Sequence, residues 1–484
     1  MPYEDLMSLL KQFFYQGTGK SLIIKGKPGA GKTTFALEFI GQIRDDTPVF
    51  YLPARSYDEP LRDKFPWIKE IKSGKIYANQ NQTNLNSVVR TSLEKMEKRI
   101  EEKLTTSDPY SYDSGLVFNV SELMPDIEAM YDFVNENMGM NPIIVLDSID
   151  ALTETYKLDR ELLFSILQKD LVESSGAGLI CIMEEKESTK LEYFSDGVIS
   201  LDYALNEHFL VRSVVLDKLR GVSVGSSPFY LYTLLNGIFL PFQRIPIIYP
   251  ENKRDHVVKD ETKQFSVSMG NPSLAMLNDT GEPTIPLGSV LMIHRVNNTN
   301  NVDEIVKLIK NNLVMHTIAN GRGVIDVSSS NYETSRVMLG AADKEWLSHY
   351  ITAEKSKKSN PYVINIEGKS VEDDFPSEVL DFYLSSSAKP ATYIFSTDYL
   401  RFIYGDSFLG GLSNLLNPIR TTGIIMIIAD EDDYQKLSHY ANLTIHLREI
   451  RGYVVANSNS NHYYAASVVY DEDRWPGVML TEIV

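Results

Sequence analysis

One segment of this chain has the residue types and the spacing needed to bind phosphate. The pattern G-x-x-x-x-G-K-T and the residue after it comprise Gly26, Lys27, Pro28, Gly29, Ala30, Gly31, Lys32, Thr33 and Thr34. Its glycines let the backbone turn so that several N–H groups face one anion. Lys32 is expected to reach the β- and γ-phosphates of a nucleotide, and the Thr33 hydroxyl is expected to ligate Mg²⁺.

The flanking residues indicate the elements that hold this loop. The apolar run at 22–24 predicts a buried strand, and apolar residues recur at helical spacing from Phe35 to Ile43. A helix that begins near Lys32 would add the positive end of its dipole to the loop. A glycine-rich turn with a solvated lysine is the alternative, and the presence of strand, loop and helix together disfavours it.

An aspartate follows a second buried run and supplies a candidate anchor for the metal. Residues 143–146 are four consecutive apolar residues, and Asp147 comes directly after them. Ligands of parallel α/β sheets bind beyond the carboxyl ends of the strands, so Asp147 is expected to bind Mg²⁺ together with the loop. Asp150 is expected to lie further out.

Composition limits the classes of function. The chain has 484 residues and a formal net charge of −18, which argues against a general nucleic-acid or anionic-membrane surface. Its length suggests about three domains, although two larger ones also fit. The single cysteine excludes an intrachain disulfide. No signal-like segment is found at the N-terminus, and no apolar run approaches the ~18 residues that span a bilayer, so we expect a cytoplasmic protein without membrane contact.

The order of predicted elements indicates two α/β domains. Strands are predicted at 22–25, 49–52, 143–147, 178–183, 198–201, 210–218 and 229–234, with helices between the first four. This arrangement predicts a nucleotide-binding domain at 1–240 with an insertion at about 60–140. A proline-rich connector is predicted at 241–285, and a second domain at 286–484.

The second domain repeats part of the first. Residues 190–201 align without gaps on residues 436–447, and a glycine-led apolar strand that ends in acids precedes each segment. Two similar helix-to-strand transitions in one protein are the alternative. Because the order of elements repeats as well as the sequence, we interpret the pattern as an internal duplication.

The second copy lacks the residues for nucleotide chemistry. Its first strand continues into residues 294–301, which contain no glycine-lysine-threonine. The strand that best matches 143–147 places Ser396 where Asp147 stands in the first copy. We therefore predict no nucleotide at this position.

Four segments occur in the order typical of one family, and here the chain resembles RecA-superfamily ATPases of the KaiC type. They are 26–34, 145–150, 196–201, and Arg212 followed by 218–221. The resemblance covers 18–240. It implies an α/β, RecA-like fold with a mainly parallel sheet and helices on both faces, followed by a degenerate second RecA-like domain. It also implies ATP and Mg²⁺ as ligands, and a homo-oligomer with nucleotide between subunits.

The same resemblance implies catalytic groups supplied by a neighbouring subunit. ATPases of this type use a lysine and an arginine of a K-x-R-G turn at the neighbour's γ-phosphate, which gives that role to Lys218 and Arg220. One residue separates them, so on an extended chain both side chains point the same way. A solvated basic pair beside a turn is the alternative.

One position departs from the KaiC pattern. The strand after the phosphate loop usually ends in paired glutamates that orient the attacking water, but here it ends in Ala54 and Arg55. Water activation then depends on a nearby acid such as Asp58 or Glu59, or it is poor, and Arg55 could instead stabilise phosphate charge. This predicts tight nucleotide binding with slow hydrolysis.

The arginine-bearing strand, the Phe65-Pro66-Trp67 segment, the length and the eroded second half resemble the archaeal gas-vesicle regulatory family GvpD. That resemblance implies an ATP-binding regulator that controls a transcription activator through protein contact. Two alternatives stay open. A RecA-like motor or recombinase on DNA would need basic DNA-binding loops, and no long basic run is found. A KaiC-like autokinase would retain labelled phosphate on the protein, but no residue stands out as the acceptor.

Overall fold

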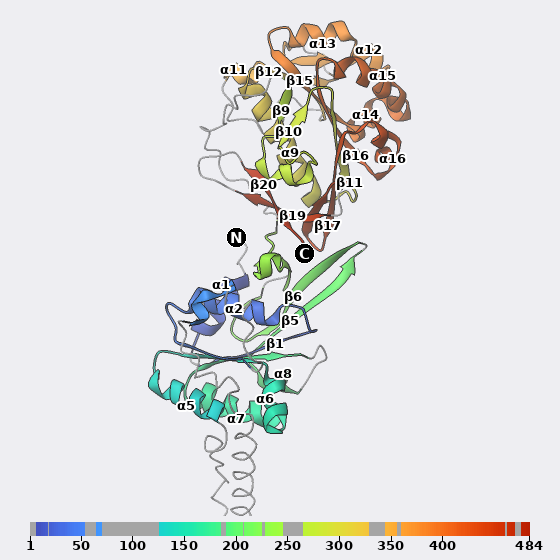
Figure 1. Cartoon of the computed structure of the whole chain (residues 1–484). Coiled ribbons are helices and arrows are strands. Elements are labelled where there is room, and N and C mark those ends of the chain that lie inside the picture. Colours follow the sequence, from blue (N-terminus) through green and yellow to red (C-terminus); the bar gives the residue numbers. More distant parts are fainter. Residues whose placement is uncertain are drawn as a thin grey trace, which may run out of the picture. The chain divides into compact units, whose positions relative to one another are not determined.

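The computed structural model describes residues 6–17, 19–53, 64–69, 125–184, 190–206, 208–224, 228–244, 265–328, 344–355, 360–459, 462–469 and 476–484. The chain divides into two compact units, Met1–Pro241 with Val484, and Phe242–Ile483 (Figure 1). Each unit is an α/β structure built on one large sheet whose central strands are parallel. The predicted fold class is therefore confirmed. Residues 70–124, the larger part of the insertion predicted at about 60–140, lie outside the described residues.

The first unit contains eight described strands in one sheet, in the order β2-β3-β4-β1-β5-β6-β7-β8. Their bounds are β1 Ser21–Gly26, β2 Val49–Pro53, β3 Ile143–Asp147, β4 Gly178–Met183, β5 Gly197–Asn206, β6 Phe209–Leu219, β7 Phe229–Thr233 and β8 Leu240–Pro241. The strands β2, β3, β4, β1 and β5 run parallel to one another. The strands β6, β7 and β8 then each run antiparallel to the strand before them. The inner strands β1 and β4 are buried along their whole length, which explains the apolar runs at 22–24 and 179–183.

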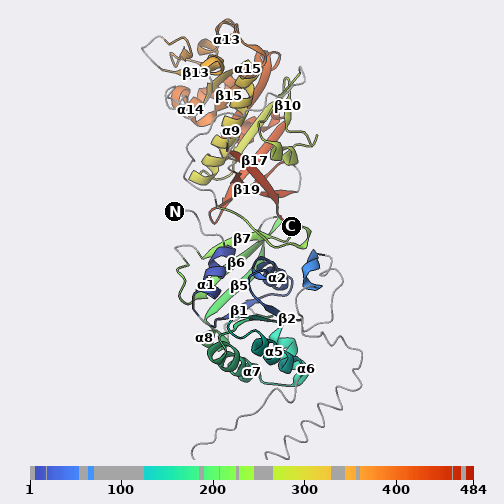
Figure 2. The ribbon, with the colours of Figure 1, turned by 90° about the vertical axis from the view of Figure 1, so that its left-hand side faces the viewer.

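Helices cover both faces of this sheet (Figures 1 and 2). Helices α1 (Leu6–Tyr15) and α2 (Lys32–Ile43) pack on one face, in one hydrophobic cluster. A second cluster covers the other face. It includes α5 (Pro125–Glu136), α6 (Ile149–Tyr156), α7 (Arg160–Leu167), the π-helical turn η3 (Gln168–Ser174) and the short α8 (Leu191–Phe194). Helix α5 falls in the range predicted as an insertion, yet its apolar side packs into the core.

The second unit contains a sheet of ten described strands, in the order β14-β13-β12-β15-β16-β11-β17-β18-β19-β20. The strand bounds are β11 Val290–Arg295, β12 Arg322–Val327, β13 Tyr350–Glu354, β14 Val363–Asn365, β15 Ala388–Ser396, β16 Gly423–Asp430, β17 Leu443–Ile450, β18 Tyr453–Asn457, β19 Tyr463–Val469 and β20 Gly477–Glu482. The helices are α9 Asn300–Ala319, α11 Lys344–Leu347, α12 Val371–Asp374, α13 Ser377–Leu384, α14 Thr397–Tyr404, α15 Phe408–Arg420 and α16 Glu431–Leu437. Two separate hydrophobic clusters lie on the two faces.

The two sheets share one strand order. Reading β11, β12, β15, β16 and β17 as counterparts of β1, β2, β3, β4 and β5 reproduces the first sheet, with β13 and β14 added beyond β12. The antiparallel strands β18, β19 and β20 follow β17 as β6, β7 and β8 follow β5. This equivalence gives the second unit the predicted RecA-like topology.

One hydrogen bond occurs at the same place in both sheets. The backbone N–H of Ser21 donates to Asp196 Oδ2 at 3.1 Å, and the N–H of Val290 donates to Asn442 Oδ1 at 2.9 Å. Asp196 and Asn442 are partners in the gapless alignment of 190–201 with 436–447. The equivalence aligns β1 with β11 so that Gly26 corresponds to Arg295.

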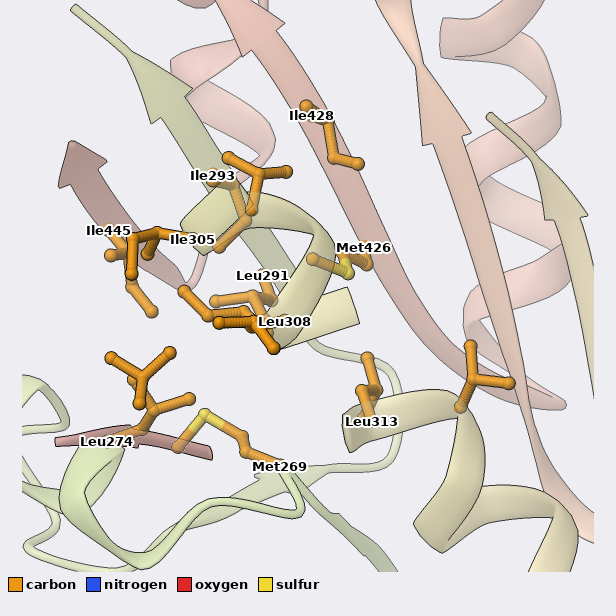
Figure 3. Packing of buried hydrophobic residues seen from close by; sticks show 14 of the residues in the cluster. Met269, Leu274, Leu291, Ile293, Ile305, Leu308, Leu313, Met426, Ile428 and Ile445 are labelled. Carbon is orange, nitrogen blue, oxygen red and sulfur yellow. The ribbon is translucent and has the colours of Figure 1, made fainter. Parts of the chain in front are cut away.

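The connector predicted at 241–285 requires a correction for its second half. Residues 265–285 include β9 (Ser266–Ser268), the 3₁₀ helix η5 (Pro272–Leu277) and the start of β10 (Thr284–Pro286). Met269 and Leu274 of this segment pack with Leu291, Leu308 and other residues of the second unit's core (Figure 3). Turn residues mark this segment as a loop in sequence, but five of its apolar side chains pack into the core that includes α9: Val267, Met269, Leu274, Leu277 and Ile285.

No helix among the described residues is long and apolar enough to cross a membrane.

Candidate nucleotide-binding site

The phosphate loop connects β1 to α2, as predicted. Gly29 and Gly31 have φ values of 79° and 83°, in the left-handed region that favours glycine. A Cβ at Gly26 would lie 2.1 Å from the carbonyl oxygen of Leu201, so only glycine fits there. Gly31 is the N-cap of α2 and has no side chain to cap the helix, which leaves first-turn N–H groups directed at the loop.

Lys32 lies folded over the loop. Its Nζ donates to the carbonyl oxygens of Gly26 at 2.8 Å and Lys27 at 3.0 Å, and the residue is buried. A buried ammonium held by neutral carbonyls is placed to bind an anion at the same position. The side chain therefore lies where a phosphate oxygen would replace the loop carbonyls as acceptor.

Asp147 and Thr33 meet at the end of β3. The Thr33 side chain hydrogen-bonds to Asp147, and Tyr51 Oη donates to Asp147 Oδ2 at 2.8 Å. Burial raises the pKa of Asp147 above the ordinary value for an aspartate, while the hydrogen bonds from Thr33 and Tyr51 and the charge of Lys32 oppose this rise. A hydroxyl and a carboxylate side by side offer two oxygen ligands, the kind that Mg²⁺ uses together with substrate phosphates.

Tyrosines of β5 and β7 support the loop. Tyr203 Oη donates to the Pro28 carbonyl oxygen at 3.3 Å, and Tyr232 Oη donates to the Ala30 carbonyl oxygen. Lys27 forms an ion pair of 3.0 Å with Asp202. Sequence reasoning missed the tyrosines because their roles depend on strand pairing, although each lies in a predicted or observed strand beside the loop.

Asp150 has a structural role. It pairs with Arg160 at 2.8 Å, and its Oδ2 accepts the backbone N–H of Glu184, also at 2.8 Å. This agrees with the prediction that Asp147 is the closer of the two aspartates. Arg212 of β6, which belongs to the KaiC-like pattern, lies opposite Tyr203 of β5. Its guanidinium carbon is 5.9 Å from the centroid of the Tyr203 ring.

Lys218 and Arg220 lie far from the loop of their own chain. Gly197 pairs with Leu219 and with Leu22 at the start of β1, whereas the loop follows the other end of that strand. Lys218 Nζ donates to the carbonyl oxygens of Glu192 and Ser195, at 2.9 and 2.6 Å. Burial, together with the nearby Arg220, lowers the pKa of Lys218. Both residues thus lie at the opposite end of the sheet from the phosphate loop.

An arginine occupies the equivalent strand end in the second unit. Arg295, the counterpart of Gly26, forms ion pairs with Asp303 at 3.3 Å and with Asp398, and its side chain is only 10% exposed. Ser396 pairs with Ile428 on β16, just as Asp147 pairs with Ile182 on β4. The register therefore places Ser396 at the position of Asp147, as the sequence predicted.

The predicted residue Arg55 lies outside the described residues, and so do Asp58 and Glu59. Their positions relative to the loop stay predictions.

Comparison with known families accounts for most of the chain. Residues 10–217 match the family model "GvpD gas vesicle protein, P-loop domain", and residues 296–484 match "GvpD basic region 2". The chain belongs to the GvpD family.

Two relatives in this family come from Halobacterium salinarum. Protein GvpD1 is 24% identical over 238 residues, which is 48% of this chain and 39% of that protein. Protein GvpD2 is also 24% identical over 238 residues, or 48% of this chain and 43% of that protein. The match thus spans less than half the length of either relative. The GvpD P-loop model includes the whole glycine-rich loop and Asp147, which supports nucleotide binding at this position.

Proposed function

We propose that this member of the GvpD family is an ATP-binding regulatory protein in which slow ATP hydrolysis switches a protein–protein interaction. The observation that carries the proposal is the meeting of Lys32, Thr33 and Asp147 beside a glycine loop at the start of α2. These residues fit a nucleoside triphosphate with Mg²⁺. The loop N–H groups and Lys32 would hold the phosphates, while Thr33 and Asp147 would hold the metal, which neutralises charge on the phosphates.

The proposed partner is a protein, and control of a transcription activator is the proposed task. The net charge of −18 favours a protein partner over nucleic acid. Even the segment that matches the "basic region 2" model contains more Asp and Glu than Lys and Arg in this chain. The RecA-like second unit, with an arginine in place of the loop glycine, would provide a binding surface without chemistry of its own.

We also propose a cytoplasmic homo-oligomer in which Lys218 and Arg220 reach a neighbouring subunit's nucleotide. Their position at the far end of the sheet supports a role in trans, because neither residue lies beside its own loop.

The test is Mg²⁺–ATP binding and turnover on the purified protein, with Lys32→Ala as the variant. The hydrogen bond from charged Lys32 to a phosphate is worth about 1.5–3 kcal/mol, so its loss should weaken nucleotide binding roughly 10- to 100-fold. Lys190→Ala is the matched control, because Lys190 is an exposed lysine whose ion pair with Glu161 is 3.5 Å long. We expect tight binding and turnover below ~1 s⁻¹ in the unmodified protein. Turnover in the ordinary enzyme range would instead favour a motor, and unchanged binding in Lys32→Ala would refute the site.

A further inference from the structure

The phosphate loop contains a tight turn. The N–H of Ala30 donates to the Lys27 carbonyl oxygen at 3.2 Å, which closes a β-turn with Pro28 and Gly29 at its central positions. Proline there and a φ of 79° at Gly29 are typical of a type II turn. A type I turn differs from it in the orientation of the central peptide group, here the one that joins Pro28 to Gly29. The conformation of the loop thus depends on how this peptide group is turned.

Two glycines of the loop have N–H groups available for an anion. In the described part of the chain, no hydrogen-bond acceptor is found for the N–H of Gly29 or Gly31, whereas Ala30 uses its own N–H within the turn. Gly29 is exposed and Gly31 is half-buried. In a planar trans peptide group, the N–H points away from the carbonyl of the preceding residue. The carbonyls of Pro28 and Ala30 therefore decide where these two N–H groups point.

A tyrosine hydroxyl holds each of these two carbonyls. Tyr203 Oη donates to the Pro28 carbonyl oxygen at 3.3 Å, and Tyr232 Oη donates to the Ala30 carbonyl oxygen. Tyr232 is fully buried, and its ring stacks on Phe239 with the ring centroids 4.4 Å apart. Burial raises the pKa of Tyr232, so its hydroxyl keeps the proton that it donates. The two hydroxyls thus bind the carbonyls on the side opposite to the glycine N–H groups.

Strand pairing places both tyrosines beside the loop. Tyr203 of β5 lies opposite Arg212 of β6, which in turn lies opposite Tyr232 of β7. Side chains at opposite positions of antiparallel strands lie on the same face of the sheet. The ammonium of Lys27 lies 5.3 Å from the centroid of the Tyr203 ring and pairs with Asp202. Both hydroxyl donors therefore belong to the sheet, and their position does not depend on the loop.

We propose that Tyr203 and Tyr232 are positioning residues that lock two peptide groups of the loop, so that the N–H groups of Gly29 and Gly31 face a bound phosphate. The assignment rests on the proposed function. Glycine lets the peptide group before it turn over at little cost. A peptide group turned the other way would direct its partly negative carbonyl oxygen at the phosphate. Each tyrosine excludes that orientation before the ligand arrives, which lowers the cost of binding.

The test measures Mg²⁺–ADP affinity of the full chain by calorimetry in Tyr232→Phe and Tyr203→Phe. Phenylalanine keeps the ring and its packing and removes only the hydroxyl. We expect affinity to fall about 3- to 10-fold in Tyr232→Phe, and about 2- to 3-fold in Tyr203→Phe, whose hydrogen bond is longer and exposed. Tyr131→Phe is the matched control. It removes a hydroxyl that binds Asp170 at 2.8 Å on the other face of the sheet, and it should leave affinity unchanged.

A second measurement follows the loop N–H groups themselves by nuclear magnetic resonance. Isotope-labelled glycine, combined with carbonyl-labelled proline or alanine, identifies the Pro28–Gly29 and Ala30–Gly31 peptide groups. Both glycine amide protons should shift downfield when Mg²⁺–ADP binds to the unmodified chain. Tyr232→Phe should reduce the shift of Gly31 more than that of Gly29, and Tyr203→Phe should do the reverse. A general loss of stability would not produce this pairing of one tyrosine with one glycine.

The outcomes separate this inference from the proposed function. If both variants keep the affinity and the glycine shifts of the unmodified chain, the tyrosines do not position the loop, while weakened binding in Lys32→Ala still supports the nucleotide site. A lower melting temperature with equal changes at both glycines makes the tyrosines merely structural and overturns the inference. An unmodified chain that binds no Mg²⁺–ADP overturns the proposed function and this inference together.

Discussion

Single residues of the nucleotide site show a conflict between stability and function. Asp147 is a partly buried carboxylate whose pKa is raised mainly by burial, and Lys32 is a buried ammonium bonded to two carbonyl oxygens. Both groups are arranged for ligands that carry charge. Before ligand binds, the folded chain holds these charges at a cost in free energy.

Replacing Asp147 by Asn should stabilise the ligand-free protein and abolish Mg²⁺-dependent nucleotide binding. The folded chain binds the Asp147 proton more tightly than the unfolded chain does. Stability is therefore lost as the pH rises from the ordinary aspartate pKa to the raised one, and it stays lost at neutral pH. We expect a gain of roughly 0.5–2 kcal/mol near neutral pH, seen as a higher melting temperature.

The gain should vanish at a pH below the ordinary aspartate pKa, where both states are protonated. A variant that is less stable than the parent at neutral pH would show that the hydrogen bonds from Tyr51 and Thr33 outweigh the burial of the charge.

Among the elements, the loop after the first strand differs most between the two units. In the first unit the strand ends at Gly26 and the loop glycines keep the space open for an anion. In the second unit Arg295 fills the strand end and binds Asp303 in the first turn of α9 and Asp398 in α14. Arg295 thus links α9 and α14, which correspond to the helices that follow the phosphate loop and the Asp147 strand in the first unit.

Arg295→Met should destabilise the second unit without creating a nucleotide site. It leaves two carboxylates without their shared cation. Because Asp303 and Asp398 are 40% and 47% exposed, we expect a loss of about 1–3 kcal/mol, less than for a fully buried pair. Chemical unfolding followed by tryptophan fluorescence and circular dichroism would measure it.

Lys307→Met on α9 is the matched control, since it removes a partly exposed ion pair with Glu304 worth about 0–1 kcal/mol. Equal losses in the two variants would contradict a structural role for Arg295.

Local sequence patterns predicted correctly those strands whose residues are almost all buried. The bounds of β3 and β4 agree with prediction because continuous apolar runs end there at polar or turn residues. The sequence predicts a connector over residues 265–285 in place of β9, η5 and β10, because the structure of short or irregular segments is decided by tertiary packing. The phosphate loop and Asp147 could be predicted because the glycine-rich motif directly follows one apolar strand and Asp147 lies at the end of another.

At the scale of the whole molecule, the predicted trans role requires subunits that share their residues. Lys218 and Arg220 lie at one end of the first unit's sheet, and the phosphate loop lies at the other. Mixing Lys32→Ala chains with Arg220→Ala chains should then restore part of the turnover that each variant lacks alone. An intact loop in one subunit would meet an intact Arg220 from another.

The mixing experiment is read by turnover at constant total protein, after the variants have exchanged subunits. No recovery, in a mixture shown by cross-linking to contain mixed oligomers, would exclude Arg220 as a group that acts in trans.

The strand order also has a consequence for synthesis on the ribosome. The phosphate loop follows β1, which precedes the other described strands of its sheet in sequence, yet its neighbours are β4 and β5, so Ser21 pairs with Leu179. Likewise, β11 can pair with β16 only after β16 has been synthesised, since Val290 pairs with Ile425. Contacts this distant along the chain make folding slow and leave an apolar strand unpaired while translation proceeds. A nascent chain therefore cannot form its nucleotide site until β4 and β5 have been translated. Until then its unpaired apolar strand is exposed, and the chain depends more on chaperones than the folded protein does.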